Sequence, residues 1–496
     1  MNLEFNPYNI LGVADTASTE EIKAAYRRIA RRLHPDVNPN SKAAAAQFQD
    51  VTIAYELLVD PLRRKSYDER IAREGVNESD LYFTLQVTPS KRTLMTLPEQ
   101  QVIYLLTEIF PDPRAHDLYH RREARLNLTL VLDRSNSMSG TRMEKVKVAA
   151  YQIIENLNDD DILSVVSFND RAEVVVPATT IDDRPALKAK VGVMNPSGGT
   201  EIFQGLYAGV QENRKFLGPR LVNHIILLTD GHTFGDQERC IELAVQAASE
   251  GIGISAMGLG HDWNDEFLDE LASKTGGNTS YVNSASAVVR FLNDYVRNLV
   301  NAFAERIHLS VATDPDVVLE SAFKLSPHPQ PVEADGGDIP LGSLQANRPI
   351  AVLLQFQLPP NLKDGFRYVA RLVAQGEILS NKQQKYQMIT EFASEVTDRV
   401  IDDDPPSAIL DALSKLTLYR LQEKAKDALE QGDVGEATRR LENLATRLLA
   451  MGERELADQA LSEARRVAHT SHLSDKGRKT LKYQTRHLLL GPANEE

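Results

Sequence analysis

The chain lacks the features of a secreted or membrane-spanning protein. Its 496 residues include one cysteine, Cys240, so neither an intramolecular disulfide nor a cysteine-based zinc site can form. Met1 to Tyr8 is short and polar, without the basic and apolar regions of a signal peptide. The longest apolar runs, such as Ile225 to Leu228, are far too short to cross a bilayer. We therefore expect a cytoplasmic protein with no membrane insertion.

The chain also lacks a basic excess. Its formal net charge is −14, from 56 Lys+Arg and 70 Asp+Glu, which argues against binding nucleic acid through a general basic field. The first 70 residues are balanced, with ten basic and ten acidic side chains, so the acidic excess lies downstream. No phosphate-binding loop of the Gly-x-x-x-x-Gly-Lys-Ser/Thr type and no Gly-x-Ser-x-Gly elbow is present. We expect no nucleic-acid partner and no enzyme activity.

A succession of different periodicities predicts a multidomain fold. Length alone suggests roughly three domains. The two strand-rich regions flank an α/β region, and we expect them to pair into one β-sandwich into which the α/β domain is inserted. The predicted regions are helices over 5–70, a linker over 71–80, strands over 81–123, a doubly wound α/β domain with a mainly parallel sheet over 124–304, strands over 305–398 and a helical bundle over 405–490.

The N-terminal helices surround a short polar loop. Ser18 and Glu21 have capping-box spacing, and Ile22, Ala25, Ile29 and Leu33 recur at helical spacing after them. A basic stretch, Tyr26 to Arg32, leads into the tripeptide His34-Pro35-Asp36. Taken alone, such a tripeptide indicates only a turn, and a basic helix is most often a solvated surface. Here the tripeptide follows the basic stretch and lies between two amphipathic helices.

This arrangement resembles the J domain of DnaJ-type proteins over about residues 5–70. Pro7 to Gly12 before the tripeptide, and Ala54 to Leu58, Asp60-Pro61 and Arg63 to Asp68 after it, complete the pattern. The resemblance implies docking on a DnaK-type ATPase chaperone and stimulation of its ATP hydrolysis. His34, Pro35 and Asp36 would form the stimulating loop. A basic docking face would comprise Lys23, Tyr26, Arg27 and Arg31. Val37 departs from the basic residue often found after the tripeptide, which leaves partner choice open.

A second constellation begins where a buried strand gives way to a helix. Asp133, Ser135 and Ser137 alternate after the apolar run Leu128 to Leu132, so their oxygens can converge at the carboxyl end of that strand. Two further loops fall at equivalent places and contribute Thr200 and Asp230. Three hydroxyls and two carboxylates make a small, hard, all-oxygen site that suits Mg²⁺, with Mn²⁺ and Ca²⁺ as alternatives.

The five residues resemble the metal-ion-dependent adhesion site (MIDAS) of von Willebrand factor A-type (vWA) domains, over about residues 124–304. Asp133, Ser135 and Ser137 match its first loop, Thr200 its second and Asp230 its third. The resemblance implies that the metal keeps one coordination position for an acidic side chain of a protein partner. Each residue taken singly is an ordinary turn or cap residue, so the expectation depends on the joint pattern.

Several other polar residues carry weaker signals. Asp159 to Asp161 fits a cap between helix and strand better than a metal site. His232 and His261 lie near loop ends, where a surface role is the simpler interpretation. Arg142 and Lys145 are predicted to be solvated helix residues.

Two functions fit these observations. In the first, the chain is a targeting co-chaperone that binds an unknown protein client or complex through its vWA region and brings a DnaK-type chaperone to it. In the second, it is a metal-dependent binding scaffold whose J domain serves mainly for recruitment. A metal-dependent hydrolase fits less well, because no nucleophile–base pair is evident.

Overall fold

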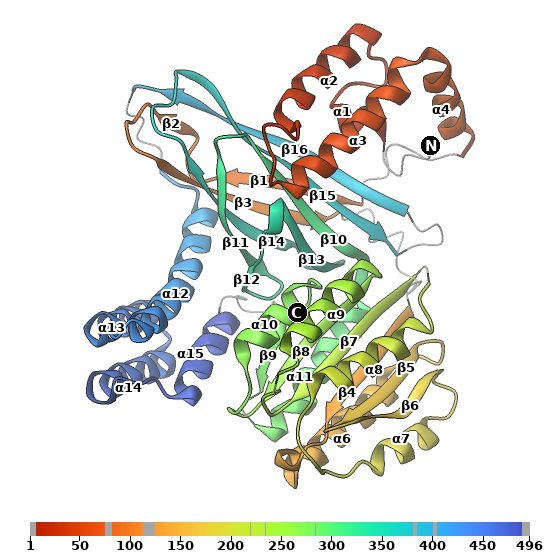
Figure 1. Ribbon diagram of the computed structural model, residues 1–496, viewed down its shortest axis with the longest axis vertical. Helices are drawn as coiled ribbons and strands as arrows, with labels where there is room; N and C mark the ends of the chain where they lie inside the picture. Colours follow the sequence, from red (N-terminus) through yellow and green to blue (C-terminus); the bar gives the residue numbers. More distant parts are fainter. Residues whose placement is uncertain are drawn as a thin grey trace. The chain divides into compact units, whose positions relative to one another are not determined.

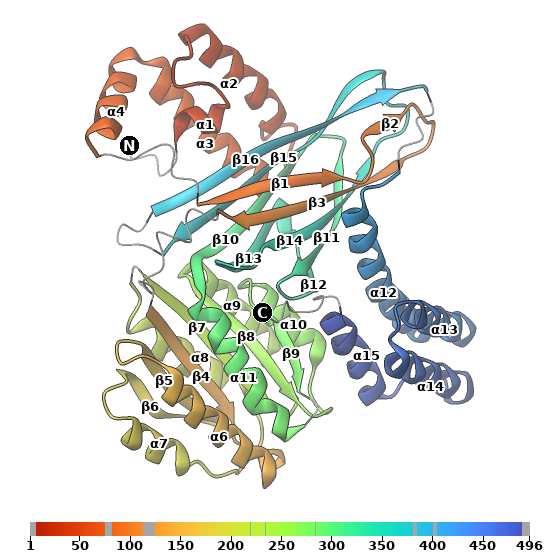
Figure 2. The ribbon, with the colours of Figure 1, turned by 180° about the vertical axis from the view of Figure 1, so that it is seen from behind.

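A computed structural model describes residues 6–74, 82–112, 125–218, 220–233, 235–282, 284–379, 384–399 and 404–488. The chain divides into two compact units, which are described separately (Figures 1 and 2). The first unit comprises Met1–Arg122, Phe303–Ser326 and Pro331–Leu410. The second comprises Glu123–Ala302, Pro327–Gln330 and Asp411–Glu496.

The first unit begins with four helices around one apolar core. Ser18 caps α2 as its spacing predicts: its hydroxyl accepts from the Glu21 amide at 3.3 Å, and the Glu21 carboxylate accepts from the Ser18 amide at 2.7 Å. Ile22, Ala25, Ile29 and Leu33 are all buried on one face of that helix. The helices are α1 (Pro7–Leu11), α2 (Thr19–Leu33), α3 (Lys42–Val59) and α4 (Pro61–Glu74).

The rest of the first unit is a β-sandwich of two five-stranded sheets. Their strand orders are β1-β3-β14-β11-β12 and β13-β10-β15-β16-β2. Neighbours pair antiparallel in the described ladders, except that β2 runs parallel to β16. The strands are β1 (Phe83–Pro89), β2 (Thr93–Met95), β3 (Gln101–Pro111), β10 (Ala302–Thr313), β11 (Val318–Ser326), β12 (Gln330–Val332), β13 (Asp338–Gln345), β14 (Ile350–Leu358), β15 (Gly365–Ile378) and β16 (Gln384–Thr397).

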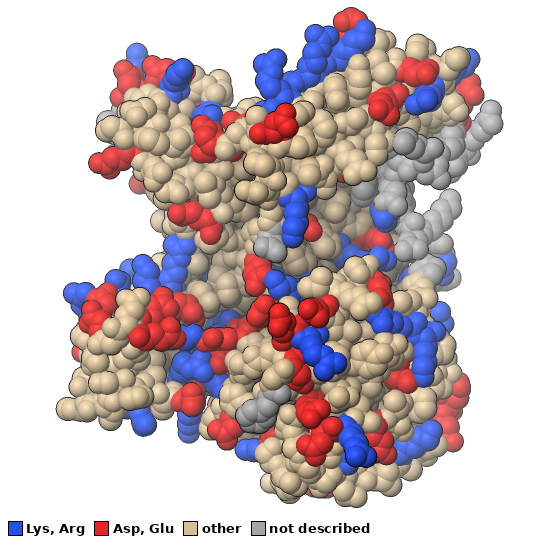
Figure 3. All heavy atoms as spheres, in the orientation of Figure 1, with Lys and Arg blue, Asp and Glu red and all other residues tan. Residues whose placement is uncertain are grey.

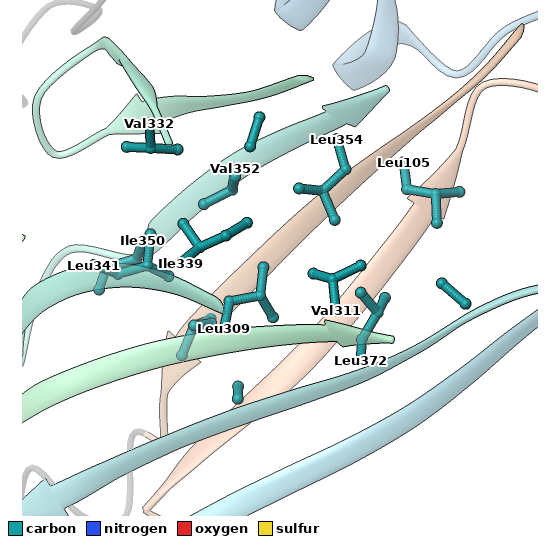
Figure 4. Close-up of a cluster of buried hydrophobic side chains, with 14 of the residues drawn as sticks. Leu105, Leu309, Val311, Val332, Ile339, Leu341, Ile350, Val352, Leu354 and Leu372 are labelled. Carbon is teal, nitrogen blue, oxygen red and sulfur yellow. The ribbon is translucent and has the colours of Figure 1, made fainter. Parts of the chain in front are cut away.

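Aliphatic side chains from both sheets fill the sandwich. Leu105 of β3 and Leu354 of β14 come from one sheet, and Leu309 of β10 and Leu372 of β15 from the other (Figure 4). All four are fully buried. Because β1, β2 and β3 precede the α/β region and the other core strands follow it, neither stretch could close this core without the other.

The four N-terminal helices are attached to the sandwich through a buried arginine. Arg371 of β15, only 5 % exposed, donates to the Ile10 carbonyl at 2.7 Å and to Gln47 Oε1 at 3.0 Å. Gln47 of α3 donates in turn to Ser310 Oγ of β10 at 2.9 Å. Burial lowers the pKa of Arg371 to about 10, which leaves it charged at neutral pH. The helices are therefore held to the sheet by a hydrogen-bonded cation.

The second unit contains a six-stranded sheet in the order β6-β5-β4-β7-β8-β9. Every neighbouring pair is parallel except β5 with β6. Helices α8, α9 and α10 cover one face, and α6 and α11 lie together on the other (Figures 1 and 2). The elements are β4 (Arg125–Asp133), α6 (Thr141–Asn156), β5 (Ile162–Phe168), β6 (Ala172–Thr180), α7 (Arg184–Gly192), α8 (Ile202–Arg214), β7 (Leu221–Thr229), α9 (Gln237–Ser249), β8 (Ile252–Leu259), α10 (Asp265–Ser273), β9 (Thr279–Val282) and α11 (Ala285–Val300).

Four helices end the described chain: α12 (Ser407–Glu430), α13 (Val434–Ala450), α14 (Arg454–Thr470) and α15 (Asp475–Leu488). Gly432 and Gly452, both at positive φ, follow α12 and α13, where the sequence predicts breaks between helices. Leu444, Leu448, Ala457 and other small or aliphatic side chains form the bundle core.

Helix α15 meets α10 of the α/β domain through a network of ion pairs. Asp265 accepts from Arg478 at 2.7 Å and from Lys482 at 2.7 Å. Asp269 pairs with Lys482 at 2.9 Å and with Arg486 at 2.8 Å. Burial alone would raise the pKa of Asp265, but the charges of Lys482 and Arg478 outweigh it and hold the pKa at about 2. Each buried carboxylate therefore stays ionised between two cations.

A second contact of α15 is with the loop that precedes α10. Lys479, which is 1 % exposed, donates to the carbonyl oxygens of His261 and Trp263, and its ammonium lies 4.6 Å from the Trp263 ring centroid. The rings of Tyr281 and Tyr483 lie 6.3 and 5.7 Å from that of Trp263. The loop backbone is therefore fixed by a side chain of the C-terminal helices.

The predicted fold class is confirmed: an N-terminal helical domain, a doubly wound α/β domain, flanking antiparallel sheets and C-terminal helices. Helix α4 continues to Glu74, four residues into the segment expected to be a linker, and residues 75–81 lie outside the described residues. Within the region expected to form strands over 305–398, β12, β13 and β16 were not predicted individually, and neither were β2 and β9 elsewhere. No helix in the described ranges is long and apolar enough to span a membrane.

The attachment of the N-terminal helices can be tested at Arg371. Arg371→Met keeps much of the side-chain volume but leaves the Ile10 carbonyl and Gln47 amide oxygen unpaired. We expect a loss of about 2–4 kcal/mol in the free energy of unfolding and faster amide hydrogen exchange in α1 and α3. Arg367→Met is the matched control, because Arg367 on the same strand pairs with Asp314 of its own sheet at 3.2 Å. Equal exchange in the two variants would contradict the assigned role of Arg371.

The contact of α15 with α10 predicts a specific pH dependence. Since the folded-state pKa of Asp265 lies near 2, below its ordinary 3.8, its stabilising effect is present above pH 4 and disappears as the pH falls towards 2. In urea unfolding, Asp265→Asn should cost about 2 kcal/mol at pH 7 and almost nothing near pH 2. Asp475→Asn, which removes a mostly exposed carboxylate 3.8 Å from Arg478, should change little at either pH.

Candidate metal centre and chaperone-docking face

The first loop of the predicted metal centre starts at the last residue of β4. Asp133 is fully buried, Ser135 is 2 % exposed and Ser137 lies in a short 3₁₀ turn, Asn136–Met138, and is exposed. The loop is tied to the second one by backbone hydrogen bonds from Asn136 N to Gly198 O at 3.1 Å and from Ser197 N to Arg134 O at 2.7 Å. Parallel strand order thus brings two distant loops to one edge of the sheet.

Four of the five predicted residues form one hydrogen-bonded chain. Ser135 N donates to Asp133 Oδ1 at 2.8 Å. The hydroxyls of Ser135 and Ser137 lie 2.9 Å apart, and the Ser137 hydroxyl donates to Asp230 Oδ1 at 2.6 Å. The hydroxyl of Thr229, the last residue of β7, donates to Asp133 Oδ2 at 2.7 Å, a contact that the sequence did not suggest.

The fifth residue, Thr200, faces the same group from the second loop. It is half-buried, and its hydroxyl would stand 3.1 Å from a Cβ placed on Gly231, the neighbour of Asp230. Gly198 has φ +77°, and an added Cβ would lie 2.4 Å from the carboxylate of Asp170. That carboxylate accepts from the Gly199 amide at 3.0 Å. Asp170 thus shapes the second loop, which explains why two glycines precede Thr200.

Burial sets the electrostatics of the centre. It raises the pKa of Asp133 to about 6, against the lowering effect of the hydrogen bonds from Thr229 and Ser135, and the nearby charge of Asp230 raises it further. Asp230 is 1 % exposed and forms an ion pair with Arg142 of α6. Two carboxylates buried side by side favour a cation between them.

Arg142 was expected to be a solvated helix residue, and this expectation is wrong. Its Nη1 donates both to Asp230 Oδ2 and to the Ser137 carbonyl, the latter at 3.2 Å. Its position in the first turn of α6 was visible in the sequence. Its partner was not, because Asp230 lies 88 residues further along the chain.

The donor set fits a small, hard cation. It offers two buried carboxylates and three hydroxyls, all of them oxygen ligands of the kind Mg²⁺ takes. The described residues contain no group of three or more His, Cys, Asp or Glu side chains that could hold a metal, and these five residues include only two of that kind. Any ion here would therefore depend on hydroxyls and water for its remaining ligands.

The predicted chaperone-docking residues lie at the end of α2 and along it. His34, Pro35 and Asp36 are all exposed, and the Asp36 amide donates to His34 Nδ1 at 3.2 Å. The His34 ring lies edge-on to Phe48 of α3, with ring centroids 5.5 Å apart. The turn closes through the amide of Val37, which donates to the His34 carbonyl at 3.1 Å.

The basic residues of α2 divide between two roles. Arg27 and Arg31 are exposed, and Figure 3 shows basic side chains gathered over α2. Arg32 instead donates to Glu391 of β16 at 3.1 Å and lies 3.7 Å from the centroid of the Tyr368 ring. The sequence alone does not separate it from its neighbours.

The other two residues of the predicted face have partners within the helical domain. Lys23 is half-buried and donates to Glu20 at 2.9 Å. The Tyr26 ring stacks on Tyr55 of α3, with centroids 4.1 Å apart.

The weaker candidates have local partners. Asp161 accepts from the amides of Leu126 and Asn158, both at 2.8 Å, so it caps a turn. His261 Nδ1 lies 2.8 Å from the Tyr281 hydroxyl. His232 is exposed beside the third loop.

Three protein families match successive parts of the chain. They are the DnaJ domain over residues 6–68, the von Willebrand factor type A domain over residues 127–294 and the Sll0103-like C-terminal alpha-helical domain over residues 407–491. The chain therefore contains a DnaJ domain, a vWA domain and an Sll0103-like C-terminal helical domain. A J domain implies a co-chaperone role with an Hsp70 (DnaK-type) chaperone, and a vWA domain suggests protein binding. Both are non-catalytic modules.

Individual relatives match only parts of the chain. A protein from Synechocystis, described as uncharacterized protein sll0103, is 32 % identical over 247 residues, which are 48 % of this chain and 59 % of that protein. Chaperone protein dnaJ 39 of Arabidopsis thaliana is 52 % identical over 63 residues, 13 % of this chain and 15 % of that one. The chain thus spans less than two thirds of the length of these relatives.

Solved structures extend the likeness of fold. A von Willebrand factor type A protein from Catenulispora acidiphila superposes with a TM-score of 0.65 at 17 % identity, over 83 % of this chain and 98 % of that one. The ArnB paralog VWA2 from Sulfolobus acidocaldarius gives 0.51 at 14 % identity, over 82 % and 99 %. These coverages far exceed the vWA match, so the shared fold includes elements outside the α/β domain.

Proposed function

We propose that the chain is a targeting co-chaperone. Its J domain docks on a DnaK-type chaperone and stimulates ATP hydrolysis there, while its vWA domain binds a protein client or complex. The observation that carries the proposal is the exposure of His34, Pro35 and Asp36 at the end of a helix whose Arg27 and Arg31 also face solvent. A basic face of this kind steers an acidic partner and raises the association rate.

In this proposal the residues of α2 have separate roles. His34, Pro35 and Asp36 act on the chaperone, and Arg27 and Arg31 contact it. Lys23 and Tyr26 complete the docking face. Arg32 lies outside the face, because it is engaged with Glu391. Attachment of the J domain to the sandwich through Arg371 supports a fixed presentation of the loop.

The vWA domain would hold Mg²⁺, or alternatively Mn²⁺ or Ca²⁺, through Asp133, Ser135, Ser137, Thr200 and Asp230. The ion would supply an electrophilic binding position for a carboxylate of the partner. The chain's own residues orient the site: Thr229 and the Ser135 amide fix the carboxylate of Asp133. The exposed Ser137 and half-buried Thr200 leave one side open towards solvent. This use of an ion is binding rather than hydrolysis.

The scaffold function remains the second candidate. The five oxygen-bearing side chains come from the vWA domain alone, without any residue of the J domain. In this second candidate, metal-dependent binding of a partner is the main activity and chaperone recruitment is secondary. The cytoplasmic location is part of both proposals. It is supported by the single cysteine, Cys240, which is buried and whose thiol pKa is raised by that burial.

The J-domain function predicts that the purified chain stimulates the steady-state ATPase of a DnaK-type chaperone. His34→Gln should remove most of that stimulation without changing the unfolding temperature, because the side chain is exposed. Asn40→Ala, an exposed change just beyond the same loop, is the control and should stimulate like the wild type. An unchanged ATPase rate with wild-type chain would rule out the co-chaperone proposal.

The metal centre predicts that Asp133→Ala weakens Mn²⁺ binding by roughly 100-fold or more, because it deletes a charged ligand. Isothermal titration measures this directly. Asp160→Ala removes an exposed carboxylate of the same domain and should bind Mn²⁺ like the wild type. In a pull-down of protein partners with and without Mg²⁺, loss of partner binding in Asp133→Ala but not in Asp160→Ala would favour the scaffold function. Capture that survives both this change and a chelator would exclude the metal centre as the binding site.

A further inference from the structure

Both carboxylate oxygens of Asp230 are already engaged. Oδ1 accepts from the Ser137 hydroxyl at 2.6 Å, and Oδ2 accepts from the Arg142 guanidinium. The side chain of Asp230 is fully buried, whereas that of Arg142 is 39 % exposed. The cation of this ion pair can therefore move out into water, but the anion cannot.

The guanidinium has two hydrogen-bond acceptors and lies close to the backbone of a third loop. Besides Asp230, it donates to the Ser137 carbonyl at 3.2 Å. On its other side lies the backbone of Gly260, where an added Cβ would be 3.3 Å from Arg142 Nη2. Gly260 has φ +77°, so a larger residue would be both strained and in contact with the guanidinium.

The loop that contains Gly260 is itself fixed. The Trp263 indole donates to the Gly260 carbonyl at 2.9 Å, and Lys479 of α15 donates to the carbonyls of His261 and Trp263. Arg142 therefore rests in a preformed position between this loop and Asp230.

We propose that Arg142 is an internal counter-ion that competes with the divalent cation for Asp230. This inference depends on the proposed metal-binding function of the same centre. A cation that uses Asp230 as a ligand must displace the guanidinium or bind beside its positive charge. Either requirement reduces the affinity of the centre for the cation. When displaced, Arg142 is free at the rim of the site, where an incoming carboxylate can pair with it. Arg142 thereby sets the metal affinity and couples it to an anionic partner.

The test measures binding of Mn²⁺ alone to the full chain, by isothermal titration and by the electron paramagnetic resonance signal of free Mn²⁺. Arg142→Ala should bind about 5- to 10-fold more tightly than the wild type, because a partly exposed ion pair no longer opposes the ion. Arg142→Lys, which keeps the charge but loses the planar fork, should lie between the two. Lys145→Ala removes one positive charge from the next turn of α6 and should stay within about twofold of the wild type.

The outcomes separate the inference from the function on which it depends. If the wild type and Arg142→Ala bind Mn²⁺ equally, or the variant binds more weakly, Arg142 does not compete and the inference fails while the metal centre stands. If neither binds, both fail. If Lys145→Ala tightens binding as much as Arg142→Ala, the effect is one of general charge and the inference fails. Unfolding temperatures without metal verify that each variant is folded.

Discussion

Strand β3 pairs with β14 on one side and with β1 on the other, and the whole α/β domain lies between β3 and β14 in the sequence. Nine residue pairs, from Gln101 with Leu358 to Ile109 with Ile350, fix the register of this ladder. A slip by one residue would turn Leu105 and Leu354 away from the core, because side chains alternate between the faces of a strand. The ladder therefore joins a strand that precedes the α/β domain to one that follows it.

The same sandwich carries the J domain on its other sheet. Arg371 and Gln47 make that attachment with hydrogen bonds rather than apolar packing alone. Charged groups are expensive to bury, and here Nη1 and Nη2 of Arg371 are paired with the helices in one geometry, whereas its buried Nε has no hydrogen-bond partner among the described residues. The contact therefore fixes the orientation of the J domain on the sheet. Arg32 takes part in it through Glu391, whereas Arg27 and Arg31 remain exposed.

Much of the fold could be predicted from the sequence. The elements with strong periodicity, such as α2 with its capping box, and the alternation of strands and helices after Leu126 were predicted, whereas α7, α10, β9 and α11 were not predicted individually. Strands β13 and β16 escaped because their side chains mix polar and apolar residues on partly exposed positions, so the two-residue period is weak. The metal-centre residues could be proposed because Asp133, Ser135, Ser137 and Asp230 lie at or just after the ends of strands and Thr200 precedes a helix. Arg142, Thr229 and Asp170 could not, because their roles depend on which distant loops the sheet brings together.

The chain has a single tryptophan, and its position has a practical consequence. Trp263 is 1 % exposed and lies between the Gly260 carbonyl, the Lys479 ammonium and the rings of Tyr281 and Tyr483. Indole emission depends on the polarity of its surroundings and on nearby charge. The tryptophan fluorescence of the chain, as distinct from that of its 15 tyrosines, therefore originates at one junction between the α/β domain and α15. It gives a spectroscopic readout of that junction without any label.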